Sequence, residues 1–132
     1  IYTLSLHDAL PICRFWDVPQ FDEIAKRNHE LAVTLFDYGV NSGQTRAVVA
    51  LQRALNSLNR QAKDYPDIAA DGLIGPMTLH CLDEYIKRRG TEGIIVLNNL
   101  VRAIRSVFLL ELTERSPSQE VFNYGWQKRA MT

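Results

Sequence analysis

Asp37 and Asn41 are the polar residues whose spacing is most suggestive of a site, because they stand four positions apart in a helical stretch. Residues four apart share one face of a helix, and this face lies beside the apolar residues Phe36 and Val40. A polar pair beside an apolar stripe is expected to be partly buried and hydrogen-bonded. The pair could line a ligand cleft, or it could tie the helix to its neighbours and shape the turn at residues 42–43. We favour the structural role.

A second polar cluster lies in the stretch DGLIGPMT, which contains Asp71 and Thr78. Its two glycines permit a tight turn, and Asp71 can accept hydrogen bonds from backbone N–H groups within that turn. Thr78 can help to organise the start of the helix that follows. The cluster could belong to a binding surface or could be a helix–loop–helix staple without ligand contact. Turn chemistry explains each residue, so we favour the staple.

Hydrophobic periodicity, together with Gly and Pro, divides the chain into helices separated by turns. We expect an all-α fold of about five helices, because no stretch sustains the alternation of a strand. Asn28 is suited to cap the first helix and Gly43 to close it. Pro76 is suited to the first turn of a later helix, which Gly90 closes. The expected helices cover residues 28–43, 45–63, 76–90, 91–114 and 119–130.

The composition describes an ordinary globular chain. Its 132 residues include 15 basic and 15 acidic side chains, so the charge balance does not support a nucleic-acid partner. The longest apolar pattern, IIVLNNLVRAIRSVFLLEL, is broken by Asn and Arg, and we expect no membrane span. Neither the two cysteines, Cys13 and Cys81, nor the three histidines have the spacing of metal ligands. We therefore expect no metal and no cofactor.

Residues 1–12, IYTLSLHDALPI, show neither a clean helical or strand period nor the pattern of a secretory signal. One back-translation of this stretch resembles a widely used sequencing-library adapter read in frame. The T that follows in the adapter fits the first base of a Cys13 codon. We therefore expect residues 1–12 to be a non-native scar, and the natural segment before Cys13 to be missing.

Five motifs occur in a fixed order along the chain: FW, FDYGVNSG, LQRALN, DGLIGPMT and GWQKR. Together they resemble the C-terminal part of glycoside hydrolase family 108, bacterial and phage N-acetylmuramidases, over about residues 14–130. The resemblance implies a lysozyme-like helical bundle fragment. Residues 13–43 would be a remnant of the catalytic region, and residues 44–132 a helical peptidoglycan-binding domain of type 3. It also implies that the parent enzyme cleaves the MurNAc-GlcNAc bond and that glycan strands of peptidoglycan are the partner.

The family's proposed catalytic Glu lies in a Glu-Gly-Gly-Tyr segment, and nothing in this sequence matches it. Glycoside hydrolysis needs a carboxylic acid of raised pKa, usually in an apolar pocket. Glu23 and Glu30 are the nearest candidates by position. Glu23 is expected on a solvated helical turn, and Glu30 suits the first turn of its helix for dipole reasons alone. We therefore expect no catalytic residue in this chain and no activity from it as it stands.

Under this resemblance Asp37 and Asn41 would line the floor of a glycan cleft, and the loop at Asp71 would belong to a wall-binding surface. Trp16 is the best aromatic candidate for stacking on a sugar ring. Trp126 is more simply an anchor of the last helix onto the domain. The substrate-binding candidates are thus Trp16, Asp37, Asn41, Asp71 and Thr78.

Three hypotheses about function stay open. The chain is part of a muramidase, or it is a wall-binding module that was never catalytic, or it is a secretion-linked interaction protein with only structural lysozyme ancestry. We expect synthesis in a bacterial cytoplasm and action at the cell wall or periplasm, by an export route that the sequence does not specify. Loss of the N-terminal region should expose the apolar side of the helix that carries Asp37 and favour self-association.

Overall fold

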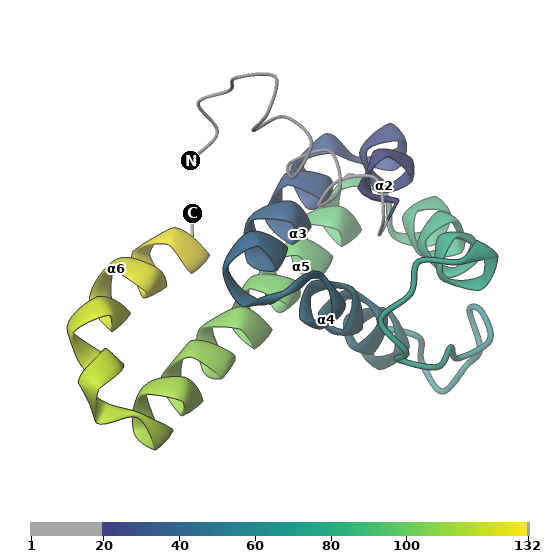
Figure 1. Ribbon diagram of the computed structural model, residues 1–132. Coiled ribbons are helices and arrows are strands. Elements are labelled where there is room, and N and C mark those ends of the chain that lie inside the picture. The colour runs from purple at the N-terminus through teal and green to yellow at the C-terminus, as the bar shows by residue number, and fades with distance from the viewer. Residues whose placement is uncertain (1–19, 132) are drawn as a thin grey trace.

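The computed structural model describes residues 20–131, and this part of the chain is all-α and contains no strand (Figure 1). The all-α fold and the expected number of helices are therefore confirmed for these residues. The five α-helices are α2 (Phe21–Arg27), α3 (His29–Ser42), α4 (Gln44–Ser57), α5 (Pro76–Arg115) and α6 (Glu120–Ala130), and a short 3-10 helix, η1 (Pro117–Gln119), precedes α6. Residues 1–12 and Trp16 lie outside the described residues.

Single residues separate the first three helices. Asn28 caps α3 as predicted, because its side chain accepts a hydrogen bond from the Leu31 N–H at 2.8 Å. Gly43 closes α3 as predicted, with a φ of 99° that favours glycine. The seven-residue α2 was expected only as a solvated helical turn, but it buries Phe21 and Ile24 completely. It is therefore part of the core.

Helix α5 consists of two arms that meet at Gly90, where the chain changes direction (Figure 1). Gly90 has a φ of 64° and a ψ of −152°, which no α-helix contains. The predicted pair of helices, 76–90 and 91–114, corresponds to these two arms. The buried Tyr85 hydroxyl donates a hydrogen bond to the Gly93 carbonyl at 2.6 Å and so joins the arms across the corner.

Helix α4 ends six residues before the predicted end at residue 63, because the chain turns left-handed after Ser57. Arg60, Gln61 and Ala62 have φ values of 48°, 60° and 62°, which are incompatible with a right-handed helix. The loop then runs back along α4 until Pro76 starts α5. The periodicity of residues 45–63 did not reveal this reversal.

One hydrophobic core joins α2, α3, α4 and both arms of α5. The apolar stripes predicted from the sequence supply most of it. Their completely buried members are Leu31, Leu35, Val48, Leu51, Leu55, Leu82, Leu97 and Val101. Helix α6 contributes only Ala130 among the buried residues, and with the end of α5 it forms a hairpin beside the core (Figure 1).

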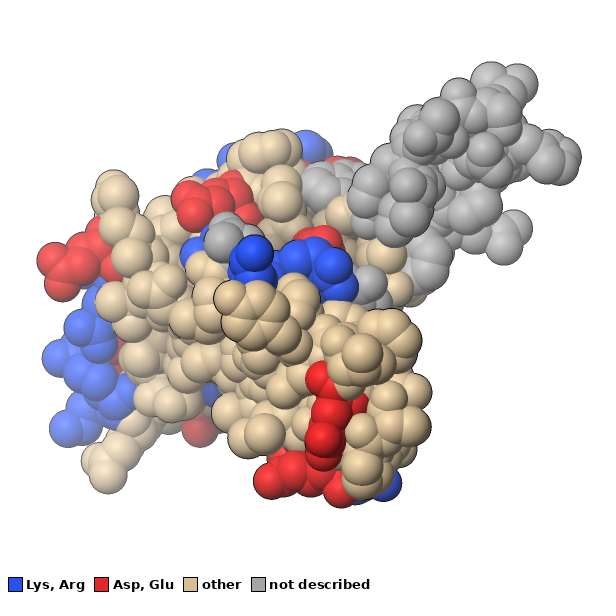
Figure 2. Space-filling model, turned by 90° about the vertical axis from the view of Figure 1, so that its left-hand side faces the viewer, with Lys and Arg blue, Asp and Glu red and all other residues tan. Residues whose placement is uncertain are grey.

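The apolar side of α3 is covered, contrary to the expectation that it would be exposed. Helices α2, α4 and α5 pack on it, and Val33, at 45%, is the one large apolar residue of α3 that is exposed in the described chain. Exposed apolar side chains gather instead on the end of α5 and on α6. Figure 2 shows this side of the molecule, where uncharged surface is broad and the basic and acidic side chains form scattered patches.

Helix α5 is long and apolar enough to cross a membrane by length and composition alone. A third of the side chains in its most apolar stretch are buried inside the protein. Core helices of other proteins pass the same test, so this finding is weak support for a span.

Candidate functional site

A groove with a volume of about 950 Å³ lies between α4 and the second arm of α5. We call it the α4–α5 groove. Its walls are apolar at Val49, Leu100 and Ile104, and Tyr38 of α3 closes one side. Its charged lining residues are Arg46, Arg53, Glu111 and Arg115. The groove therefore combines an apolar floor with a net positive rim.

The two aromatic side chains in the groove offer little open ring surface. The Arg46 guanidinium lies over the Phe108 ring, 4.5 Å from its centroid. Tyr38 is only 2% exposed, and burial raises the pKa of its hydroxyl. Nearby Arg46 and Arg105 oppose that rise in part. Polar recognition in this groove thus falls mainly to the arginines.

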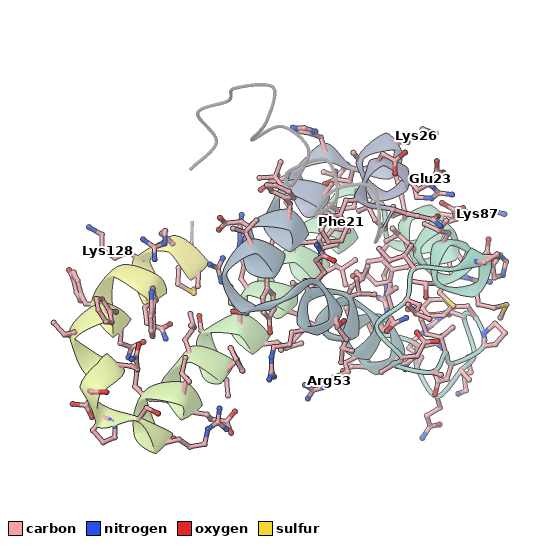
Figure 3. The ribbon with its side chains drawn as sticks, viewed as in Figure 1. Phe21, Glu23, Lys26, Arg53, Lys87 and Lys128 are labelled. Atoms are coloured by element: carbon pink, nitrogen blue, oxygen red, sulfur yellow. The ribbon has the colours of Figure 1, made fainter. Side chains whose placement is uncertain are left out.

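The groove arginines have no carboxylate partner in the part of the chain that the structure describes. Arg46, Arg53 and Arg115 form no ion pair with any residue between 20 and 131. Arg53 is exposed and extends outward from α4 (Figure 3). An arginine fork of this kind is suited to bind a carboxylate or phosphate through two parallel hydrogen bonds.

Asp37 lines a second, smaller cavity of about 370 Å³ between α3, α5 and α6. Its carboxylate accepts a hydrogen bond from Arg105 Nη1 at 2.8 Å, and Arg105 is only 3% exposed. Asp37 thus ties α3 to α5, as the favoured interpretation expected. Its proposed role in ligand binding stays a prediction. Asn41 belongs to the last turn of α3, and its side chain lies outside the described features.

Asp71 and Thr78 meet at the buried amide of Gln52 on α4. Gln52 Nε2 donates to Asp71 Oδ1 at 3.0 Å and to Thr78 Oγ1 at 3.1 Å. Asp71 Oδ1 also accepts from the Leu73 N–H at 3.0 Å. These bonds from the Leu73 backbone and from Gln52 hold the pKa of Asp71 below its ordinary value. The arrangement is the staple that we favoured, and contact of either residue with a ligand stays a prediction.

Sequence reasoning missed a row of three amides: Gln52 and Asn56 on α4, and Asn59 two residues after its end. Each amide bonds both the N–H and the C=O side of the returning loop: Gln52 reaches Gly72 and Leu73, Asn56 reaches Ile68, and Asn59 reaches Tyr65. The sequence signal that could have revealed this row is Gln52, an amide placed between the core residues Leu51 and Leu55. A buried amide needs hydrogen-bond partners, so its position predicts a polar segment packed against it.

The two carboxylates weighed as catalytic acids are both ion-paired. Glu23 accepts from Lys26 Nζ at 2.7 Å, and Figure 3 shows these two side chains together on α2. The hydrogen bond from Lys26 lowers the pKa of Glu23, which is the opposite of what a general acid needs. Glu30 lies 3.6 Å from the Arg102 guanidinium and is exposed. Neither residue has the apolar surroundings of a catalytic acid.

A comparison with protein-family models matches residues 46–131 to the family described as a Predicted Peptidoglycan domain. The match covers well over half of the chain. The chain belongs to this family. No curated protein matches it.

The peptidoglycan domain contains almost the whole α4–α5 groove. Arg46, Arg53, Phe108 and Arg115 all fall within the matched residues, and so do Asp71 and Thr78. Helices α2 and α3 precede the match but share its core. Family membership supports a role at the cell wall with peptidoglycan as the partner.

The remaining chemistry of the peptidoglycan domain is limited. No group of three His, Cys, Asp or Glu side chains in the described chain could hold a metal ion. Cys81 is buried, its thiol contacts the Pro66 carbonyl, and burial raises its pKa. A thiol in this environment is unreactive, as expected for a structural cysteine.

Proposed function

We propose that this peptidoglycan domain binds the bacterial cell wall through the α4–α5 groove. The observation that carries the proposal is a set of three arginines that line one groove within the family match and form no ion pair with residues 20–131. Peptidoglycan is the polymer that the family description points to, and its carboxylates complement these arginines. The protein would be made in a bacterial cytoplasm and act at the wall or in the periplasm.

Co-sedimentation with purified peptidoglycan sacculi tests the proposal. The full 132-residue chain should pellet with sacculi in a saturable manner and should not pellet with cellulose, a neutral polysaccharide. Binding should weaken as salt is raised, because the contacts are between charges. A chain that stays in the supernatant with sacculi at low salt would refute wall binding.

We further propose that the parent protein is a muramidase of glycoside hydrolase family 108 with a lysozyme-like bundle. Residues 13–43 would derive from the catalytic region and residues 44–132 would form the binding domain. The ordered motifs FDYGVNSG, LQRALN and DGLIGPMT support this parentage. Turbidity loss of sacculi should occur with a chain that also carries the family's Glu-Gly-Gly-Tyr region and not with the 132-residue chain. Lysis by the latter would contradict the absence of a catalytic acid.

A second candidate function is a non-catalytic interaction module linked to secretion. The exposed apolar side chains of α6 favour it, since Val121, Phe122 and Tyr124 are 77%, 53% and 79% exposed. Exposed apolar patches mark protein interfaces more often than sugar sites. This candidate gains support if the chain binds no sacculi, and loses it if wall binding is saturable.

A further inference from the structure

The α4–α5 groove carries its three arginines along a line. Arg46 and Arg53 are seven positions apart and share a face of α4. Arg46 packs on Phe108, whereas Arg53 lies beside Leu100, so α4 and the second arm of α5 run antiparallel. Arg115 lies seven residues beyond Phe108 on α5. At a rise of 1.5 Å per residue, the three positions follow a line of about 20 Å.

This positive charge is local to the groove. In the cavity between α3, α5 and α6, Arg102 lies 3.6 Å from Glu30, and Arg105 lies 2.8 Å from Asp37. Two of the three arginines that line that cavity therefore have carboxylates beside them. The groove has only one carboxylate in its lining, Glu111, against three guanidinium groups. An anionic ligand is therefore favoured in the groove, although the whole chain has no net charge.

The groove is poorly equipped for sugar rings. Protein sites commonly hold a sugar against an open aromatic face, and here the Arg46 guanidinium covers Phe108 while Tyr38 is buried. Apart from Thr45, the remaining lining is aliphatic or charged. Within peptidoglycan, the free carboxylates belong to the stem peptides that branch from the glycan strand. A line of about 20 Å matches about six residues of extended peptide.

We propose that the α4–α5 groove recognises the carboxylates of peptidoglycan stem peptides rather than the sugar rings, an inference that rests on the proposed wall-binding function. Arg53 and Arg115 are the outer carboxylate contacts. Arg46 is the central contact, and its stacking on Phe108 holds its guanidinium in place. The aliphatic floor packs against the uncharged side chains of the peptide.

Binding measurements with three ligands distinguish recognition of the stem peptide from wall binding in general. The full chain is titrated against intact sacculi, against glycan strands stripped of stem peptides by an amidase, and against a soluble stem peptide. Because the amidase leaves a free carboxylate on each muramic residue, these carboxylates are converted to amides before the stripped glycan is used. Binding to intact sacculi and to the free peptide is expected, with at least tenfold weaker binding to stripped glycan. A peptide whose carboxylates are converted to amides should also bind about tenfold more weakly, the effect of losing charge-assisted hydrogen bonds.

Substitutions of the groove arginines test whether the peptide binds in the groove. Arg53→Gln and Arg115→Gln should each weaken peptide binding about tenfold. Lys87→Gln is the matched control, because Lys87 is an exposed cation on the first arm of α5, away from the groove (Figure 3). It should bind as the unmodified chain does. Thermal unfolding of each variant checks that the fold is intact.

Each contrary result has its own meaning. Equal binding to stripped glycan and intact sacculi overturns the stem-peptide inference and leaves wall binding standing. Peptide-dependent binding that Arg53→Gln and Arg115→Gln leave unchanged overturns the groove as its location. Failure to bind any of the three ligands overturns the proposed function itself.

Discussion

Gly72 fixes the path of the loop after α4 through its backbone alone. Its φ is 81°, and a Cβ atom at this position would lie 2.5 Å from Thr45 Cγ2. Any other residue would therefore combine left-handed strain with a clash against the start of α4. Gly75, three residues later, has a φ of −108° and no atom within 4 Å of a Cβ. Of the two glycines in the DGLIG motif, only Gly72 is therefore required by the backbone conformation and by close packing.

Gly72→Ala should lower the free energy of unfolding by about 2 kcal/mol, the sum of backbone strain and local displacement of Thr45. Gly75→Ala is the matched control and should change it by less than about 0.5 kcal/mol. Chemical denaturation of both variants beside the unmodified chain gives the comparison. Equal losses at the two positions would show that the left-handed turn is not the constraint.

At the scale of elements, the loop from residue 58 to 75 is held by side chains on α4 rather than by secondary structure of its own. Gln52 is 1% exposed and serves both Asp71 and Thr78. The Asp71 carboxylate is one anchor of this tie, and its hydrogen bonds keep its pKa below the ordinary value. Protonation of the Asp71 carboxylate at low pH should therefore weaken this tie.

Because the pKa of Asp71 is lower in the folded chain than in the unfolded one, its contribution to stability is complete above about pH 4. That contribution is lost as the pH falls through the lowered pKa of the folded state. Asp71→Asn keeps an oxygen acceptor but removes the charge. The free energy of unfolding should therefore fall less steeply below pH 4 in Asp71→Asn than in the unmodified chain.

Denaturant titrations between pH 2 and 6 measure this difference. The two chains should differ most near neutral pH and converge at the acid end, where both side chains are uncharged. Parallel curves over the whole range would mean that the charge of Asp71 does not contribute to the tie.

The sequence predicted correctly those helix boundaries that depend on the local chemistry of a single residue. Asn28, Gly43, Pro76 and Gly90 each act through local chemistry, and each lies at the expected boundary. The end of α4 could not be found in this way, because Asn59 must meet Tyr65 across the loop before the reversal is visible.

The candidate site was harder to predict for the same reason. Asp71 and Thr78 were named, but their shared partner Gln52 lies 19 and 26 residues earlier in the chain. The α4–α5 groove depends on Arg46 meeting Phe108, a pairing of residues 62 positions apart that no local pattern contains. Local chemistry is readable from sequence, whereas long-range pairing is not.

At the scale of the whole molecule, the hairpin of α5 and α6 leaves apolar surface uncovered. Val121 and Tyr124, three positions apart on α6, are 77% and 79% exposed. Association that buries such side chains is favourable, since removing apolar surface from water releases about 25 cal/mol per Å². We therefore expect the chain to self-associate as its concentration rises.

Val121→Ser with Tyr124→Ser should shift this association to higher concentration in sedimentation-velocity runs. Leu73→Ser is the matched control, because Leu73 is 70% exposed but lies on the loop after α4. It should leave the association unchanged. A single monomeric species at every concentration would contradict self-association through α6.

The row of three amides on and just after α4 has a consequence for how this family can vary in length. Gln52, Asn56 and Asn59 are spaced by four and three residues, and their backbone partners at Gly72, Ile68 and Tyr65 are spaced by the same steps in reverse. Adding or deleting one residue between Tyr65 and Gly72 would put the loop out of step with at least one of the three amides. The turn at residues 60–63 lies outside this matched interval. Gaps in alignments of related chains should therefore fall in that turn and spare the stretch from 65 to 72, although both are surface loops.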